Sequence, residues 1–230
     1  MILPPKRATL RRYLRLANTR YSLLRSLEYE RIEGLTLRGR TLDVGGGTKN
    51  SYYHLLRIEG SIESVNIDPK IQPTMIADLN KPLPIASESY DNIISLNTFE
   101  HIENDTLAVA ESIRVLKRGG SFHIIVPFMY RLHGSPSDFH RHTSYWWESY
   151  LSSLGVDRDA LTVEPLLWSP VSSAFSLVEF NGLRGLRKKA VMLRTVLSHA
   201  RWPGRERLPA GYASDVYSEF ALGYYIHGTR

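Results

Sequence analysis

The sequence lacks cysteine altogether, and this absence removes several kinds of chemistry at once. Without a thiol, the chain forms no disulfides, binds no zinc through sulfur and carries no thiol nucleophile. The sequence also lacks an apolar run near the roughly 18 to 20 residues that a membrane span requires. Its first residues, MILPPKRATLRRYLRL, are interrupted by arginines and do not form the apolar region of a secretory signal. These absences predict a soluble, cytoplasmic protein.

Excess positive charge is missing from the middle of the chain and concentrated at its flanks. Residues 1–40 hold ten Lys/Arg and three Glu, and residues 184–207 hold eight Lys/Arg and one Glu, so each flank carries +7. Residues 41–183 hold ten basic and seventeen acidic residues, or −7, and the whole chain carries +6. Basic flanks of this kind suit nucleic acid, an anionic membrane or an anionic substrate.

A glycine-rich turn in residues 41–50, TLDVGGGTKN, is the feature around which the rest of the chain is organised. Leu42 and Val44 suit a buried parallel strand, and the glycines let the backbone turn tightly against a ligand. In such nucleotide-binding units an acid about 20 residues further on binds ribose hydroxyls, and SVNIDPK supplies Asp68. We expect a helix from Asn50 to Ile58, with its first amides facing the ligand.

Short apolar segments follow at the spacing of a doubly wound, mostly parallel α/β sheet. Leucines among arginines first predict an amphipathic helix or helix pair within residues 8–33. We then expect strands near Ile62–Ile67, Thr74–Ala77, Tyr90–Leu96, Ser121–Val126, Leu161–Leu167 and Phe220–Thr229, and helices at Asp105–Leu116 and Tyr145–Ser153. Lys117–Gly120 should end the first of these helices, and Ser144 should cap the second.

Several of these segments, taken in order, resemble a known family. They are the D-x-G-x-G turn at Asp43, Gly45 and Gly47, the acids Asp68 and Asp78, DNIISLNTFEHIEN with Asn97, and VLKRGGSFHIIVP. Their order is similar to that of the class I S-adenosylmethionine-dependent methyltransferases. The resemblance covers residues 40–167 and returns at the C-terminus. One departure is Lys49, where the family usually carries a third alternating glycine.

The resemblance implies a seven-stranded Rossmann-like sheet, transferase activity and S-adenosyl-L-methionine as the cofactor. The residues that it assigns to the cofactor are Asp43, Gly45, Gly47, Asp68, Asp78, Leu79 and Asn97. Asp68 matches the acid that binds ribose, and Asp78 matches the acid on the adenine side. We expect one domain over residues 1–230, made of basic N-terminal helices (1–39), a cofactor-binding core (40–168), a basic helical insertion (169–210) and the last strand (211–230).

Histidines are the candidate catalytic residues. The cofactor arrives activated, so the protein must mainly align the reacting atoms, and a base is needed only to take the acceptor's proton. A histidine suits a hydroxyl acceptor because its pKa is near neutral. The candidates are His101, after the fourth strand, and His140 and His142, in a loop over residues 128–143. Packing within that loop is the alternative role for each ring.

The same loop carries the candidate substrate residues. His133 and Asp138 stand near the H-x-H pair, a pattern that also occurs in metal sites, but we expect no metal because methyl transfer does not require one. SPSDFHRHT resembles the D-[YF]-[WH]-R-[YFH]-T segment of methyltransferases found among polysaccharide and small-molecule tailoring enzymes. In those enzymes the loop lies over the acceptor, which assigns Asp138 and Arg141 to substrate; Arg141 can equally pair with Asp138.

The sequence therefore predicts methyl transfer from S-adenosylmethionine to a hydroxyl of a small molecule or glycan, as in polysaccharide biosynthesis. The basic flanks suggest a nucleic-acid methyltransferase as an alternative. Against it, Asn97-Thr98-Phe99-Glu100 stands where base-modifying enzymes carry Asn-Pro-Pro-aromatic. A cofactor-binding protein without turnover is a further alternative. The flanks themselves either cover the acceptor pocket or contact an anionic membrane peripherally.

Overall fold

The computed structural model describes residues 21–48, 50–167, 173–174, 176–177, 190, 193 and 218–230. The helices expected before residue 21 and almost all of the 169–210 insertion lie outside these residues. Three α-helices are described: α2 (Leu23–Ile32), α3 (Asp105–Val115) and α4 (Ser144–Ser153). The strands are β1 (Thr36–Val44), β2 (Arg57–Asn66), β3 (Met75–Ile76), β4 (Tyr90–Leu96), β5 (Leu116–Pro127), β6 (Leu161–Leu166) and β7 (Gly223–Thr229).

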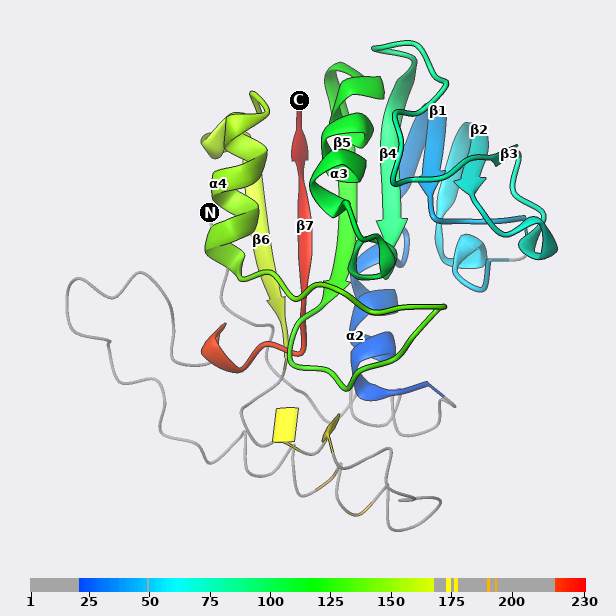
Figure 1. The fold of residues 1–230 in the computed structure, drawn as a ribbon. Helices are drawn as coiled ribbons and strands as arrows, with labels where there is room; N and C mark the ends of the chain where they lie inside the picture. The colour runs from blue at the N-terminus through cyan, green and yellow to red at the C-terminus, as the bar shows by residue number, and fades with distance from the viewer. Residues whose placement is uncertain are drawn as a thin grey trace.

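The seven strands form one sheet in the order β3-β2-β1-β4-β5-β7-β6 (Figure 1). β7 pairs antiparallel with β5 and β6, and every other pair of neighbouring strands is parallel. The direction of chain progression reverses between β1 and β4, and in open sheets ligands bind beyond the carboxyl ends of the strands at this point. The predicted seven-stranded, mostly parallel Rossmann-like sheet is confirmed.

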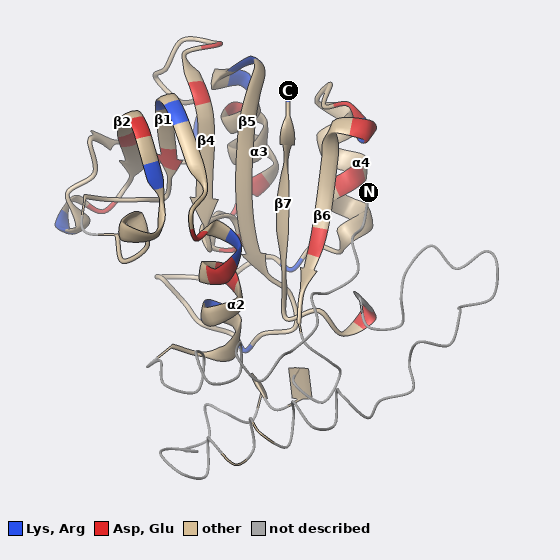
Figure 2. Cartoon of the chain, turned by 180° about the vertical axis from the view of Figure 1, so that it is seen from behind, with Lys and Arg blue, Asp and Glu red and all other residues tan. Residues whose placement is uncertain are grey.

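Apolar layers on both faces hold the sheet together. α3 and α4 cover one face, where Ile113, Trp147 and Leu151 are at most 2% exposed (Figure 1). α2 covers the other face and buries Leu24 and Leu27 against the sheet (Figure 2). Each such side chain contributes about 1.5 to 3 kcal/mol on burial. These layers fix the strand ends that carry the site.

The expected helix from Asn50 to Ile58 is wrong. A single 3-10 turn, η1 (Tyr53–Leu55), stands in its place, and β2 already begins at Arg57 opposite Thr36 of β1. The cause is tertiary: Asn50, Tyr52 and Tyr53 all donate hydrogen bonds to the buried carboxylate of Asp43, which holds this segment beneath the glycine turn. The turn is therefore followed by no helix whose amides face a ligand.

Two other boundaries also differ from the sequence-based expectation. β5 begins at Leu116, so Lys117–Gly120 belong to a strand and do not end a helix; Gly119 takes a φ of +74° there. Leu116 pairs with Tyr90, and this pairing extends β5 toward the start of β4. Thr143, and not Ser144, caps α4, because its side chain accepts from the amide of Trp146.

Candidate active site

A cavity of about 680 Å³ lies at the carboxyl ends of the parallel strands, within the range of small-molecule and cofactor sites. Its walls come from the ends of β1, β2, β3 and β4 and from the loop over residues 128–143. The lining residues are Gly45, Asn66, Ile67, Asp68, Ile71, Asp78, Leu79, Asn80, Asn97, Thr98, His101, Ile102, Glu103, Ser135, Pro136, Ser137 and Phe139. Five of the seven predicted cofactor residues thus line one cavity, and Asp43 and Gly47 do not.

Two carboxylates stand on the cofactor side of the cavity. Asp68 follows β2, accepts a hydrogen bond from the amide of Lys70 at 2.9 Å and is exposed. Asp78 follows β3 and accepts from the amide of Asn80 at 3.0 Å, and this bond is the largest of the influences that lower the pKa of Asp78. Both groups are therefore available as hydrogen-bond acceptors at the rim of the cavity.

The glycine turn brings its backbone close to the neighbouring loops. Gly45 has a φ of +85°, and a Cβ there would meet the Thr98 hydroxyl at 2.1 Å. A Cβ on Gly47 would meet the carbonyl of Ile71 at 2.4 Å, in the short 3-10 turn η2 (Pro69–Ile71) that follows Asp68. Gly45 thus forms cavity wall, whereas Gly47 lets the turn pack beside the segment that carries Asp68.

Asp43 lies beneath this turn and is fully buried. Its Oδ2 accepts hydrogen bonds from the hydroxyls of Tyr52 and Tyr53 and the amide of Asn50, whereas its buried Oδ1 has no partner in the described part of the chain. Burial raises the pKa of Asp43 to about 6, and these three donors counter the rise only in part. A buried carboxylate with an open oxygen favours a cationic group of a ligand nearby.

His101 is the predicted catalytic residue that lines the cavity. It ends the 3-10 turn η3 (Phe99–His101) after β4, and its Nδ1 lies 2.6 Å from the carbonyl oxygen of Ser137. Because a carbonyl oxygen only accepts, Nδ1 carries the proton of the neutral ring and Nε2 presents a lone pair. The amide of Phe139 donates to the Glu100 carbonyl at 2.7 Å, which fixes the loop against η3.

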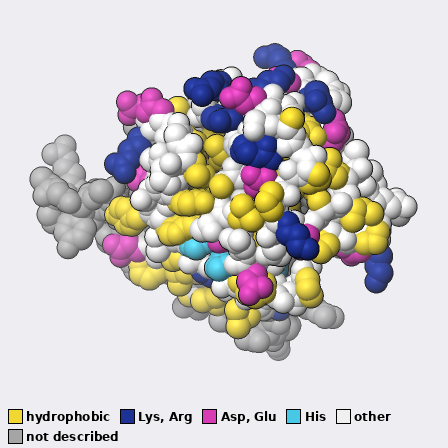
Figure 3. All heavy atoms as spheres, turned by 45° about the horizontal axis from the view of Figure 1, so that its top comes forward, with side chains coloured by type: hydrophobic (Ala, Val, Ile, Leu, Met, Phe, Trp, Pro, Cys, Tyr) yellow, Lys and Arg dark blue, Asp and Glu magenta, His cyan; other side chains and the backbone are white. Residues whose placement is uncertain are grey.

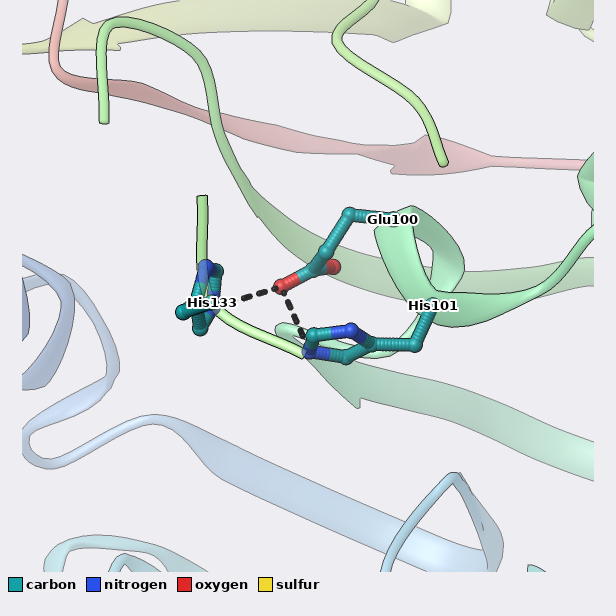
Figure 4. A group of neighbouring side chains, drawn as sticks. All are labelled: Glu100, His101 and His133. Atoms are coloured by element: carbon teal, nitrogen blue, oxygen red, sulfur yellow. Dashed lines mark ion pairs between the residues drawn. The ribbon is translucent and has the colours of Figure 1, made fainter. Parts of the chain in front are cut away.

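Glu100 follows β4 at the edge where the sequence places the site, but no chemical role for it was predicted from the sequence. Its side chain is 1% exposed, and neither carboxylate oxygen has a hydrogen-bond partner among the described residues. Burial raises the pKa of Glu100 to about 8. His101 Nε2 and His133 Nε2 lie 3.5 and 3.8 Å from its Oε1, and both rings face the carboxylate (Figure 4). The Glu-His pair in the sequence was the available signal.

His140 and His142 lie together but do not line this cavity. His142 Nε2 is 2.5 Å from the Asp105 carboxylate, and the His142 ring stacks on Trp146 at 3.5 Å between centroids. His140 Nε2 is 3.0 Å from the carbonyl of Glu103. The alternation of the H-x-H pair does place both rings on one side, toward the start of α3. Catalysis by either ring stays a prediction.

Asp138 and Arg141, the predicted substrate residues, bind each other. The Arg141 guanidinium donates to both carboxylate oxygens of Asp138, at 2.5 and 2.7 Å. Burial alone would raise the pKa of Asp138, but this pair and the amide of His133 outweigh it and lower the value to about 2. Neither side chain lines the cavity, so contact of the two with a substrate also stays a prediction.

The sequence comparison finds a family match over part of the chain. Residues 42–124, which include the glycine turn, Asp68, Asp78 and β4, match a methyltransferase domain family. The sheet is the Rossmann-like methyltransferase fold. S-adenosylmethionine is the cofactor of the chain. No curated protein matches the sequence.

Solved structures share this fold at low sequence identity. A chain from the "complex between the Haloferax volcanii Trm112 methyltransferase activator and the putative methyltransferase" is 16% identical, with a TM-score of 0.52 over 90% of this chain and 88% of that one. The [4+2]-cyclase SpnF is 15% identical, with a TM-score of 0.53 over 90% and 80% of the two chains. Haemonchus contortus phosphoethanolamine N-methyltransferase 2 is 13% identical, with a TM-score of 0.50 over 87% and 50%. Because one fold serves several activities, the fold does not identify the methyl acceptor, and the residues of the site must do so.

The cavity residues of the methyltransferase domain suit the cofactor. Asp68 and Asp78 offer acceptors for ribose and adenine donors, and Ile67, Ile71 and Leu79 provide apolar surface between them. The open Oδ1 of Asp43 matches the cationic amino-acid end of the cofactor in charge. Binding of the cofactor by these particular residues stays a prediction.

The surface of the described residues mixes charges of both signs. On the face in Figure 3, basic and acidic side chains lie beside one another and form no field of one sign. Arg38–Glu59 and Lys117–Asp91 are examples of such pairs, at 2.8 and 2.7 Å. Within the described residues, every helix is too short or too polar to serve as a transmembrane span. Residues 1–20 of the first basic flank and almost all of the second lie outside the described residues.

Proposed function

We propose that the methyltransferase transfers a methyl group from S-adenosylmethionine to a hydroxyl of a small-molecule or glycan acceptor, as in polysaccharide biosynthesis. The observation that carries the proposal is that one cavity joins Asp68 and Asp78 on the cofactor side to His101 and the 128–143 loop on the other. Ser135, Ser137 and Phe139 of that loop offer hydroxyls and an aromatic ring, which are groups that suit a hydroxylated acceptor.

His101 is the residue at which we place loss of the acceptor's proton. The cofactor supplies an activated methyl carbon, so the remaining demand on the protein is to hold the acceptor oxygen in line and to promote departure of its proton. The Nε2 lone pair of His101 is free for this purpose because Nδ1–H donates to Ser137. Of the three predicted catalytic histidines, His101 alone lines the cavity.

The test uses the full chain, S-adenosylmethionine labelled in the methyl group, and panels of sugars, oligosaccharides and phenols. A product carrying the label on oxygen supports the proposal. His101→Ala should lower kcat about 100-fold or more while leaving the affinity for S-adenosylhomocysteine nearly intact. His54→Ala, which removes an exposed histidine of η1, is the matched control. Loss of turnover on changing His140 or His142, but not His101, would overturn the assignment.

The position of the label separates this proposal from its alternatives. Label on nitrogen would point to an amine acceptor, as the name of the Haemonchus contortus neighbour suggests. Label in nucleic acid would support the nucleic-acid alternative. Binding of S-adenosylhomocysteine with no methylated product across the panels would favour a cofactor-binding protein. Membrane contact by the basic flanks and a cytoplasmic location stay predictions.

A further inference from the structure

The Glu100, His101 and His133 side chains form a group, here called the acceptor-side cluster, whose polar atoms lack partners where they face each other. His101 and His133 both turn Nε2 toward Oε1 of Glu100, at 3.5 and 3.8 Å (Figure 4). These separations are longer than the 2.7 to 3.2 Å of an ordinary N–H···O hydrogen bond. Both carboxylate oxygens of Glu100 are buried without a hydrogen-bond partner in the described part of the chain.

The other nitrogen of each ring fixes which atom carries the proton. Nδ1 of His101 lies 2.6 Å from the carbonyl of Ser137. Nδ1 of His133 lies 3.2 Å from the carbonyl of Arg131 and 3.2 Å from the carboxylate of Asp138. Since these partners only accept, both neutral rings hold their protons on Nδ1 and aim Nε2 lone pairs at Glu100. Metal-binding histidines are oriented in the same way by carbonyls and carboxylates.

Two lone pairs and an ionised carboxylate repel one another when they meet in a buried place, and a proton on Glu100 does not join the three groups, because both separations exceed those of a hydrogen bond. A metal ion bonds to imidazole nitrogen and carboxylate oxygen at about 2.0 to 2.2 Å, and tetrahedral bonds of that length separate the ligand atoms by about 3.4 Å. The observed 3.5 and 3.8 Å are within a few tenths of an ångström of that spacing. The three ligand atoms all lie within 4.8 Å of one another.

We propose that Glu100, His101 and His133 bind a divalent transition-metal ion, of which zinc is the first choice. Two nitrogens and one oxygen suit zinc, cobalt, manganese or iron better than magnesium, which prefers oxygen ligands. Three protein ligands leave a position for water or for an acceptor oxygen, as catalytic metal sites do. His101 lines the large cavity, so this position is close to where the proposed acceptor would lie. In the metal-loaded protein the Nε2 lone pair of His101 is bound to the ion, so His101 acts through the ion and not as the base itself: the bound hydroxyl becomes more acidic and its proton passes to water.

A second group of similar composition, Asp105, His140 and His142, does not need an ion. His142 Nε2 and the Asp105 carboxylate already form a hydrogen bond of 2.5 Å, too short to admit an ion between them. His140 Nε2 is directed at the carbonyl of Glu103 at 3.0 Å, so it holds a proton and offers no lone pair. This group therefore provides a natural comparison for the acceptor-side cluster.

The experiment measures metal binding directly. The full chain is stripped with a chelator, dialysed, and titrated with Co²⁺, whose visible absorption reports its coordination, and with Zn²⁺ by calorimetry. We expect one ion per chain in the unmodified protein. Glu100→Gln and His133→Asn should each weaken binding about 100-fold or more, and Asp138→Asn, which removes the partner of His133, about 10- to 100-fold. Asp105→Asn and the surface variant His54→Asn should bind as the unmodified chain does.

Each outcome of this experiment either supports or overturns the proposed metal site. Absence of binding in the unmodified chain, unchanged binding in a folded Glu100→Gln variant, or loss on Asp105→Asn would each overturn the proposal; circular dichroism shows whether a variant is folded. The catalytic role of the ion rests on the proposed hydroxyl acceptor, but its binding does not. Metal binding without methyl transfer would thus support the metal site and refute the proposed function. Methyl transfer by a chain that binds no ion would support the proposed function and refute the metal site.

Discussion

The ionisation of Asp43 should lower the free energy of unfolding of the cofactor-free protein as pH rises. The Asp43→Asn variant should show the size of this effect. The folded-state pKa is about 6, above the ordinary value of 3.8, because the carboxyl group is fully buried. A group with a raised folded-state pKa stabilises the fold below its unfolded value, and that contribution is lost as pH rises through the folded value. The relevant window therefore runs from about pH 4 to about pH 7.

The magnitude follows from the two pKa values. The difference between about 6 and 3.8, at about 1.36 kcal/mol for each tenfold change, amounts to about 3 kcal/mol in full. Roughly 2 kcal/mol of this falls between pH 4 and pH 8. Asp43→Asn keeps the size of the side chain and one acceptor for Tyr52, Tyr53 and Asn50, but it does not ionise. Any fixed cost of the amide shifts the variant equally at every pH and cancels from the slope.

The assay is urea unfolding of both proteins, without cofactor, at unit steps from pH 4 to pH 8. The free energy of unfolding of Asp43→Asn minus that of the unmodified chain should rise by about 2 kcal/mol across this range. Groups distant from Asp43 titrate alike in both proteins, so their contributions cancel from the difference in free energy of unfolding. A difference that stays constant, or that falls, would refute the assignment of a raised pKa to Asp43.

Two other predictions concern binding. Asp68→Ala should weaken the affinity for S-adenosylhomocysteine by about 1.5 to 3 kcal/mol, or roughly ten- to a hundred-fold, since a charge-assisted hydrogen bond is lost; an unchanged dissociation constant in calorimetry would contradict its cofactor role. If the basic flanks contact a membrane, the chain should sediment with anionic liposomes at low salt and be released as the Debye length falls from about 10 Å at 0.1 M to about 3 Å at 1 M; failure to sediment even at low salt would exclude this role.

The strongest apolar patterns predicted the fold well. β4 spans Tyr90–Leu96, the same residues that the sequence indicates, because a continuous apolar run flanked by polar residues has one stable place, the centre of the sheet. The helix expected after the glycine turn failed for the opposite reason. Tyr52 and Tyr53 have helix-compatible neighbours, yet their hydroxyls hydrogen-bond to Asp43, and this tertiary contact overrides local preference.

The site was predictable where it follows from strand ends and unpredictable where it depends on burial. Asp68 and Asp78 line the cavity because each stands two residues past the end of a strand, β2 and β3, and the sheet places those ends there. The position of Glu100 after β4 was predictable but its burial was not, because an acid in a polar loop is expected to be solvated, and the loop packed over η3 leaves its side chain 1% exposed. The contact of His142 with Asp105 joins residues 37 positions apart, and no local pattern announces such a contact.

Asp43 and Glu100 are both buried acids near the site whose carboxylate oxygens are not all hydrogen-bonded. Among the described residues, the buried carboxylate oxygens that lack a partner belong to these two side chains. A protein gains nothing in stability from a buried acid that is left open, because desolvation of the charge outweighs the few hydrogen bonds it makes. Such groups persist where a ligand completes them, and a cation does so when the carboxylate is ionised. A cationic cofactor beside Asp43 and a metal ion beside Glu100 would both neutralise the carboxylates, so each ligand should raise the unfolding temperature of the chain, and the two increases should add.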